Sequence, residues 1–127
     1  MDVAQQRCAA DLIVAADTVV ELDGEILEKP ADPAHARDML ARLSNTSHIV
    51  HTGVALSTTV LFSALTPADI DLYVASGEPV GKAGAYGIQG TAGAWVVRID
   101  GCYNNVVGFP LHAFAAHVSQ LVQEQLL

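Results

Sequence analysis

The chain has 127 residues, of which 51% are hydrophobic, and fourteen Asp and Glu against six Lys and Arg give a formal net charge of −8. This apolar content excludes a disordered chain, and a transmembrane helix is not expected because no uninterrupted apolar stretch reaches about 20 residues. Six cations are too few for the basic stripe that neutralises DNA or RNA, so a nucleic-acid polymer is excluded as a partner. A small anionic ligand stays compatible, since a few focused cations and a metal ion can neutralise it.

Three features favour a single cytoplasmic domain. The N-terminal sequence Met-Asp-Val-Ala-Gln-Gln-Arg lacks the charged and then apolar layout of a secretory signal. Cys8 and Cys102 are too few and too isolated for a disulfide framework or a zinc cluster. A single hydrophobic core typically fills about 100–150 residues, so the length predicts one domain over residues 1–127.

The N-terminal part predicts a buried strand followed by a turn. Residues 12–16 form a continuous apolar run that ends at Asp17, which is typical of a strand buried on both faces. Asp23 and Gly24 are a turn signal before the apolar residues 26–27. This segment is either a hairpin or a strand with a loop.

The first helix is predicted to begin at Asp32 and Pro33. Asp32 suits the N-cap because its side chain accepts a hydrogen bond from the first turn. Pro33 suits the first helical position because it has no N–H to leave unpaired. Apolar residues then recur at intervals of three and four and form one stripe: Ala36, Met39, Leu40 and Leu43.

Two strands and a second helix are expected next. Residues 48–56 alternate between apolar and polar positions, and residues 58–62 are also rich in residues that favour strands. Thr66 and Pro67 begin a helix that stops at Gly77. Its predicted buried face consists of Ile70, Tyr73 and Val74.

The C-terminal part combines a glycine-rich segment, a hairpin and a helix. Residues 77–93 contain six glycines, whose backbone can approach a ligand closely. Residues 95–99 and 103–107 flank the turn signal at Asp100 and predict a hairpin. Pro110 opens the last helix, whose apolar stripe is Leu111, Phe114, Val118, Leu121 and Val122. These elements predict one α/β domain, a mixed sheet with flanking helices.

Two charged residues of the N-terminal part are candidates for chemistry. Ligands gather at the carboxyl ends of strands in open α/β sheets, and Asp17 follows a predicted strand. Its carboxylate either holds a divalent metal or takes a proton from water, or it caps a turn without a chemical role. Lys29 is held in extended geometry by Pro30, and it either neutralises phosphate oxygens or forms a solvated surface pair with Glu28.

The segment from Gly81 to Gly90 is a candidate ligand loop. It matches neither the Walker A motif nor the dinucleotide fingerprint. Lys82 offers a cation, and Gln89 offers an amide that both donates and accepts hydrogen bonds, as a base edge requires. The alternative is a tight irregular loop whose glycines are structural.

The histidines do not predict a metal site. His48 and His51 are three apart in a predicted strand, so their side chains point to opposite faces. His112 and His117 are five apart on a predicted helix, which is a poor spacing for one ion.

Several of these segments together resemble the Maf family of nucleoside triphosphate pyrophosphatases. The matching stretches occur in family order at residues 16–20, 27–30, 51–55, 73–79, 82–90 and 105–111. They cover essentially residues 12–118, and the stretch at 82–90 is highly specific. The motifs Ala-Asp-Thr and Tyr-Gly-Ile-Gln-Gly are similar to those of the branch that prefers dTTP and UTP.

The resemblance implies an α/β fold with a cleft that cleaves a nucleoside triphosphate to the monophosphate and pyrophosphate. It also implies a divalent metal cofactor, Mg²⁺ or Mn²⁺. By matching position, Asp17 is the family's proton acceptor and a metal ligand. Lys29 and Lys82 match cations near the phosphates, and these three residues are the expected catalytic set. Thr18 and Gln89 match the positions that set the base preference.

The sequence departs from the family pattern in places that bear on activity. Family members begin with a strand, a Ser-Pro-Arg-Arg-like turn and a helical segment, and the stretch before Ala16 resembles none of these. Gly81 stands where Asp is common. The alternative is therefore a catalytically impaired Maf-like remnant that binds a nucleotide or a protein, for instance as a homodimer that covers an open sheet edge. A third interpretation is an incomplete gene product.

Overall fold

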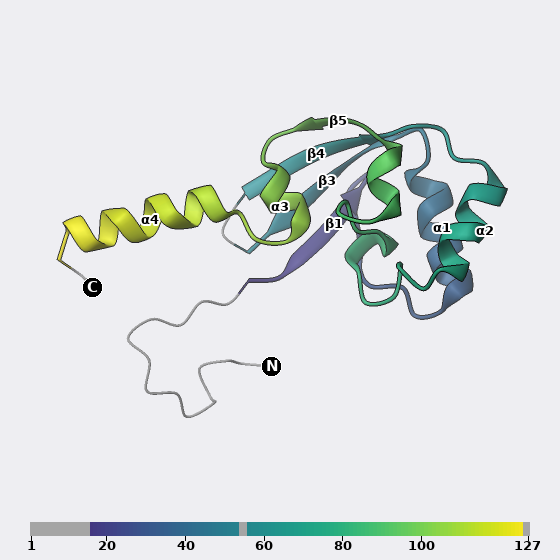
Figure 1. Cartoon of the computed structure of the whole chain (residues 1–127), viewed down its shortest axis with the longest axis horizontal. Coiled ribbons are helices and arrows are strands. Elements are labelled where there is room, and N and C mark those ends of the chain that lie inside the picture. The colour runs from purple at the N-terminus through teal and green to yellow at the C-terminus, as the bar shows by residue number, and fades with distance from the viewer. Residues whose placement is uncertain (1–15, 54–55, 126–127) are drawn as a thin grey trace, which may run out of the picture.

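The structure is a computed structural model that describes residues 16–53 and 56–125 (Figure 1). Its five strands are β1 (Thr18–Leu22), β2 (Glu25–Leu27), β3 (Ser47–Thr52), β4 (Leu56–Phe62) and β5 (Val96–Asp100). The α-helices are α1 (Pro33–Leu43), α2 (Pro67–Ala75), α3 (Tyr103–Val107) and α4 (Leu111–Gln123). Two short 3₁₀ helices, η2 (Ala83–Ala85) and η3 (Thr91–Trp95), lie in the glycine-rich segment. The predicted α/β class with flanking helices is confirmed.

The strands form one sheet in the order β2-β1-β3-β4-β5. All four pairings among these described strands are antiparallel, whereas a mixed sheet was expected. The turn between β1 and β2 explains the first pairing. Asp23 and Gly24 have φ values of 51° and 82°, which two-residue hairpin turns require because this twist matches that of the strands. The hairpin interpretation of this segment is therefore the correct one.

Local signals place the first two long helices as predicted. The Asp32 side chain accepts a 2.7 Å hydrogen bond from the His35 N–H at the start of α1. Thr66 and Asp69 form a reciprocal capping box at the start of α2. The two helices contact each other at one end of the sheet (Figure 1). Both predicted apolar faces are buried: Ala36, Met39, Leu40 and Leu43 on α1, and Ile70, Tyr73 and Val74 on α2.

Asp17 directly precedes β1, and the strand predicted to end at Asp17 lies almost entirely outside the described residues. Residues 12–15 of the predicted strand lie outside the described residues, and β1 begins only at Thr18. β1 runs antiparallel to β3, with Thr18 opposite Thr52. The Gly53 N–H continues this ladder with a 2.9 Å hydrogen bond to the Asp17 carbonyl. Asp17 therefore lies beside the carboxyl end of β3.

Residues 103–107 form the helix α3, so the predicted second arm of a hairpin is wrong. The cause is Asn105, which is fully buried. Its side-chain amide donates to the Val50 carbonyl at 2.9 Å and to the Thr58 hydroxyl at 3.1 Å. Its own carbonyl accepts a 3.1 Å hydrogen bond from the Thr52 hydroxyl. These partners lie on β3 and β4 and hold a helical turn against the sheet. The local turn signal at Asp100 does not predict such long-range bonds.

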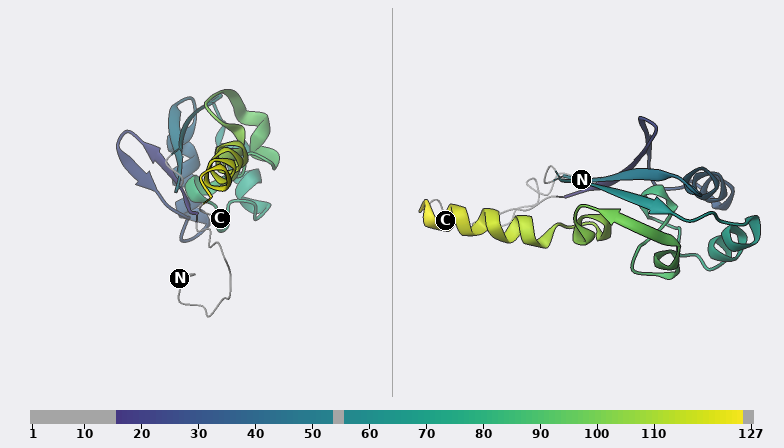
Figure 2. Two further views of the ribbon diagram at one scale, coloured as in Figure 1. Left: turned by 90° about the vertical axis from the view of Figure 1, so that its left-hand side faces the viewer. Right: turned by 90° about the horizontal axis from the view of Figure 1, so that it is seen from above.

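The two middle strands and the last helix agree in part with the sequence-based predictions. The alternation of β3 buries His48 and Thr52 on one face, as predicted, and leaves His51 on the other. Leu56 begins β4, and Val54, predicted on the same strand as His48, lies outside the described residues. α4 forms where expected, but it extends away from the sheet with no buried residue (Figure 2). Within the described ranges, no helix has the length and apolar character needed to cross a membrane.

Candidate functional site

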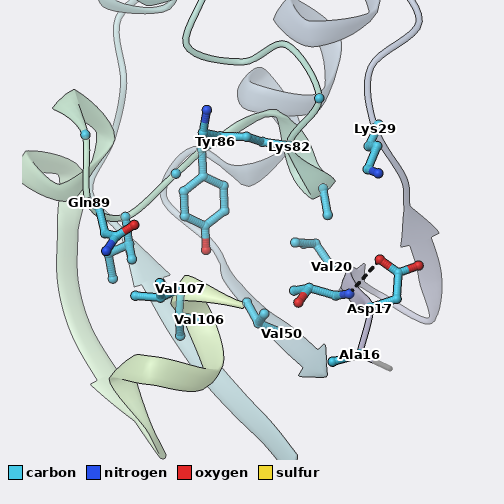
Figure 3. A pocket seen from close by; sticks show the side chains of 16 residues that line it. Ala16, Asp17, Val20, Lys29, Val50, Lys82, Tyr86, Gln89, Val106 and Val107 are labelled. Carbon is cyan, nitrogen blue, oxygen red and sulfur yellow. Dashed lines mark hydrogen bonds between the residues drawn. The ribbon is translucent and has the colours of Figure 1, made fainter. Parts of the chain in front are cut away.

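A pocket of about 300 Å³ opens beside the start of β1 (Figure 3). Its wall is built from five parts of the chain: the residues at the start of β1, the segment after β2, Val50 on β3, the glycine-rich segment and α3. All five residues selected from the sequence line this pocket: Asp17, Thr18, Lys29, Lys82 and Gln89. The fold therefore brings together residues that are up to 72 positions apart, from Asp17 to Gln89.

The two ends of the pocket differ in chemistry. Asp17 and Lys29 lie at one end, and the Gln89 amide lies at the opposite end near Val106 and Val107 (Figure 3). The Asp17 carboxylate is exposed, and its Oδ1 accepts a 2.9 Å hydrogen bond from the backbone N–H of Thr18. One end is thus charged, while the other offers apolar side chains and one amide. Such a shape suits a ligand with an anionic end and a planar end.

Lys82 lines the pocket, but its ammonium is bound to the protein itself. Nζ donates a 2.9 Å hydrogen bond to the carbonyl oxygen of Glu78. In Figure 3 the side chain points away from Asp17 and Lys29. Lys82 therefore sits at the rim, with two of its three N–H donors free of this contact.

Two glycines of the candidate loop have a structural reason to be glycine. Gly84 has a φ of 65°, and a Cβ there would come within 2.8 Å of Val20 Cγ2 on β1. The Gly84 N–H also donates to the Glu28 carbonyl at 3.1 Å, which joins the loop to the segment after β2. A Cβ on Gly87 would lie 2.7 Å from Lys82 Cε. These glycines shape the pocket wall by packing against the protein, and the segment also faces the ligand space.

Tyr86 and His48 form a buried pair beneath the pocket that the sequence analysis missed as part of the site. Tyr86 lines the pocket, and a 2.7 Å hydrogen bond joins its hydroxyl to His48 Nε2. Burial lowers the pKa of His48 to about 4 and raises the pKa of Tyr86. Both groups are therefore neutral at neutral pH, and the pocket floor carries no charge. The alternation in β3 was the available signal, since it predicts that His48 faces the core.

The Thr18 hydroxyl is held by the fold rather than free. Its Oγ1 lies 3.1 Å from the Thr52 hydroxyl and donates to the Gly108 carbonyl at 3.4 Å. These contacts tie the start of β1 to β3 and to the connection between α3 and α4. Thr18 thus fixes the pocket wall between Asp17 and α3.

Two carboxylates beside the pocket are candidates for holding a magnesium ion that arrives with a phosphate ligand. Among residues 16–53 and 56–125, no group of three His, Cys, Asp or Glu side chains forms a metal site. Asp17 and Glu28 nevertheless line one hollow next to the pocket, together with Lys29. Mg²⁺ typically binds one or two carboxylates and completes its shell with water and substrate phosphates. The pair Asp17 and Glu28 matches this usual number of carboxylate ligands.

Comparison with known proteins identifies relatives over most of the chain. The model of a family described as "Maf-like protein" matches residues 1–121. A dTTP/UTP pyrophosphatase of Salinibacter ruber is 53% identical over 86% of this chain and 60% of its own length. Those of Nitrosomonas europaea and Salmonella typhimurium are 48% and 52% identical over 88% and 78% of this chain. The chain spans 58% and 56% of the lengths of these two relatives.

Proposed function

The chain belongs to the Maf family, and we propose that it hydrolyses nucleoside triphosphates of the dTTP and UTP type to the monophosphate and pyrophosphate. One observation carries this proposal. The fold gathers the five residues that match the family's functional positions into one pocket, with a charged end and an amide-bearing end. The relatives named as dTTP/UTP pyrophosphatases support the choice of substrate.

In the proposed reaction Asp17 accepts the proton of a water molecule. The water oxygen bonds to the α-phosphorus, the bond from that phosphorus to the oxygen that bridges the α- and β-phosphates breaks, and pyrophosphate leaves with the bridging oxygen. Asp17 suits this role because its carboxylate is exposed in the pocket and is oriented by the Thr18 N–H. Only Oδ1 accepts the Thr18 N–H, so Oδ2 remains available to take the proton.

Lys29 and Lys82 are proposed to neutralise the phosphate oxygens. Fixed positive charges act most strongly where negative charge develops during the reaction. Lys29 lies at the Asp17 end of the pocket. Lys82 lines the same pocket, and two of its three N–H donors are not used by the bond to Glu78.

Gln89 and Thr18 are proposed to set the base preference. The Gln89 amide donates and accepts, which matches the mixed donors and acceptors on the edge of a pyrimidine. Thr18 acts through the wall that its hydrogen bonds to Thr52 and Gly108 hold in place. Val106 and Val107 supply apolar surface at the same end as Gln89.

A divalent cation, Mg²⁺ or Mn²⁺, is part of the proposal. Asp17 and Glu28 would hold it, and it would supply charge neutralisation to the phosphates. A cytoplasmic location is proposed with it, supported by the two isolated cysteines and by a nucleotide substrate. The homodimer stays a prediction.

Turnover of a nucleotide panel tests the proposal. With Mg²⁺ present, we expect the protein to release pyrophosphate from dTTP and UTP at least tenfold faster than from dATP or GTP, since a base-reading amide discriminates by about one to two hydrogen bonds. A chelator should abolish the release. A folded protein that binds dTTP without turnover would instead favour the impaired remnant that binds nucleotide.

A further inference from the structure

Glu78 does not line the pocket, but it contacts residues at both ends of the segment 81–90, which forms half of the pocket wall. The Glu78 carboxylate accepts two hydrogen bonds from Thr91: Oε2 from the N–H at 3.0 Å and Oε1 from the hydroxyl at 2.7 Å. The backbone carbonyl oxygen of Glu78 accepts the 2.9 Å hydrogen bond from Lys82 Nζ. Residues 81–90, which these contacts bracket, supply half of the residues that line the pocket.

The carboxylate also packs against the backbone next to Gln89. At Gly90 the Glu78 Oε2 leaves no room for a Cβ. Gly90 thus lies beside the Glu78 carboxylate, one residue from the predicted base contact. The hydrogen bond from Thr91 lowers the pKa of the Glu78 carboxyl, so it is ionised at neutral pH and both bonds are charge-assisted.

We propose that Glu78 is a positioning residue of this pocket, whose side chain sets Gln89 through Thr91 and Gly90, next to the backbone carbonyl that holds the Lys82 ammonium. Its effect on turnover rests on the proposed function, whereas its hold on the loop does not. Asp17 and Lys29 lie on other segments, so the proton-accepting end of the pocket is outside its reach. Losing the contact should therefore weaken nucleotide binding and base preference more than the chemical step.

Four variants separate this role from simple loss of stability. Glu78→Gln keeps the size of the side chain but removes the negative charge that strengthens both hydrogen bonds from Thr91. Thr91→Val removes the hydroxyl donor, and Thr91→Ser restores it. We expect KM for dTTP to rise about tenfold in Glu78→Gln, which loses the charge assistance of both bonds, and severalfold in Thr91→Val, which loses the hydroxyl bond. In both variants kcat should stay within about threefold of the original. Thr91→Ser should stay near the original protein.

The double variant of Glu78→Gln and Thr91→Val should lose less than the sum of the two single losses, because both changes weaken the same pair of hydrogen bonds. The preference for UTP over CTP should fall in Glu78→Gln and Thr91→Val and return in Thr91→Ser. An unchanged KM and base preference, with only a lower melting temperature, would reduce Glu78 to a structural role and overturn the proposal.

Amide hydrogen exchange without nucleotide keeps this test apart from the test of function. In Glu78→Gln the amides of Gly90 and Thr91 should exchange at least tenfold faster, while amides of α1 keep their rates. Unchanged exchange at these two amides would contradict the proposed hold on the loop even in a protein without turnover. If these amides exchange faster in Glu78→Gln but the original protein does not cleave dTTP, the proposed function is contradicted and the positioning role of Glu78 stands.

Discussion

Replacing Asp17 by Asn should lower kcat for dTTP hydrolysis by about 10²–10⁴-fold, because an amide cannot take the proton of the attacking water. The substitution keeps the size of the side chain and the oxygen that accepts the Thr18 N–H, so the start of β1 should keep its conformation. The measurement is pyrophosphate release at saturating dTTP, with the unfolding midpoint in urea recorded on the same sample.

Asp32→Asn is the matched control for that variant. It makes the same chemical change at the N-cap of α1, where Asn serves almost as well as Asp. It should leave both the rate and the unfolding midpoint near those of the original protein. If Asp17→Asn retains a rate within about threefold of the original, the proton acceptor is another group.

Replacing Asn105 by Ala should destabilise the fold more than any exposed substitution. The change removes two hydrogen bonds that the side chain donates to β3 and β4, and it leaves a cavity in a fully buried position. The Val50 carbonyl loses a partner where water cannot easily replace it. We expect the free energy of unfolding to fall by about 2–4 kcal/mol, as measured by urea unfolding.

Asn104→Ala is the control at the neighbouring position of α3. Gly108 and Phe109 donate to the backbone carbonyl of Asn104, which the substitution retains. Its cost should stay below about 1 kcal/mol. Equal losses in the two variants would show that the Asn105 side chain does not anchor α3.

The sequence predicted those elements whose signals are local. Asp32 with Pro33, and the turn at Asp23 and Gly24, carry their own capping and turn chemistry, so α1 and the first hairpin follow from a few neighbouring residues. By contrast, α3 depends on bonds from Asn105 to strands about 50 residues away, and the spacing at 103–107 gave no sign of them.

The site shows the same division. Asp17 was expected after a strand at residues 12–16, of which residues 12–15 lie outside the described residues. Its place beside the end of β3 depends on the antiparallel pairing of β1 with β3. The convergence of Asp17, Lys29 and Gln89 came from the family resemblance, since no spacing rule links them. The bond from Lys82 to Glu78, and the pair of Tyr86 and His48, appear only when the chain is folded.

The most direct test of the central claim is ³¹P NMR of dTTP incubated with the protein and Mg²⁺. The proposed chemistry at Asp17 predicts that the dTTP signals are replaced by those of dTMP and pyrophosphate, and that Asp17→Asn slows this change at least a hundredfold. Formation of dTDP and inorganic phosphate would contradict cleavage between the α- and β-phosphates. Unchanged dTTP with a folded protein would contradict the enzyme itself.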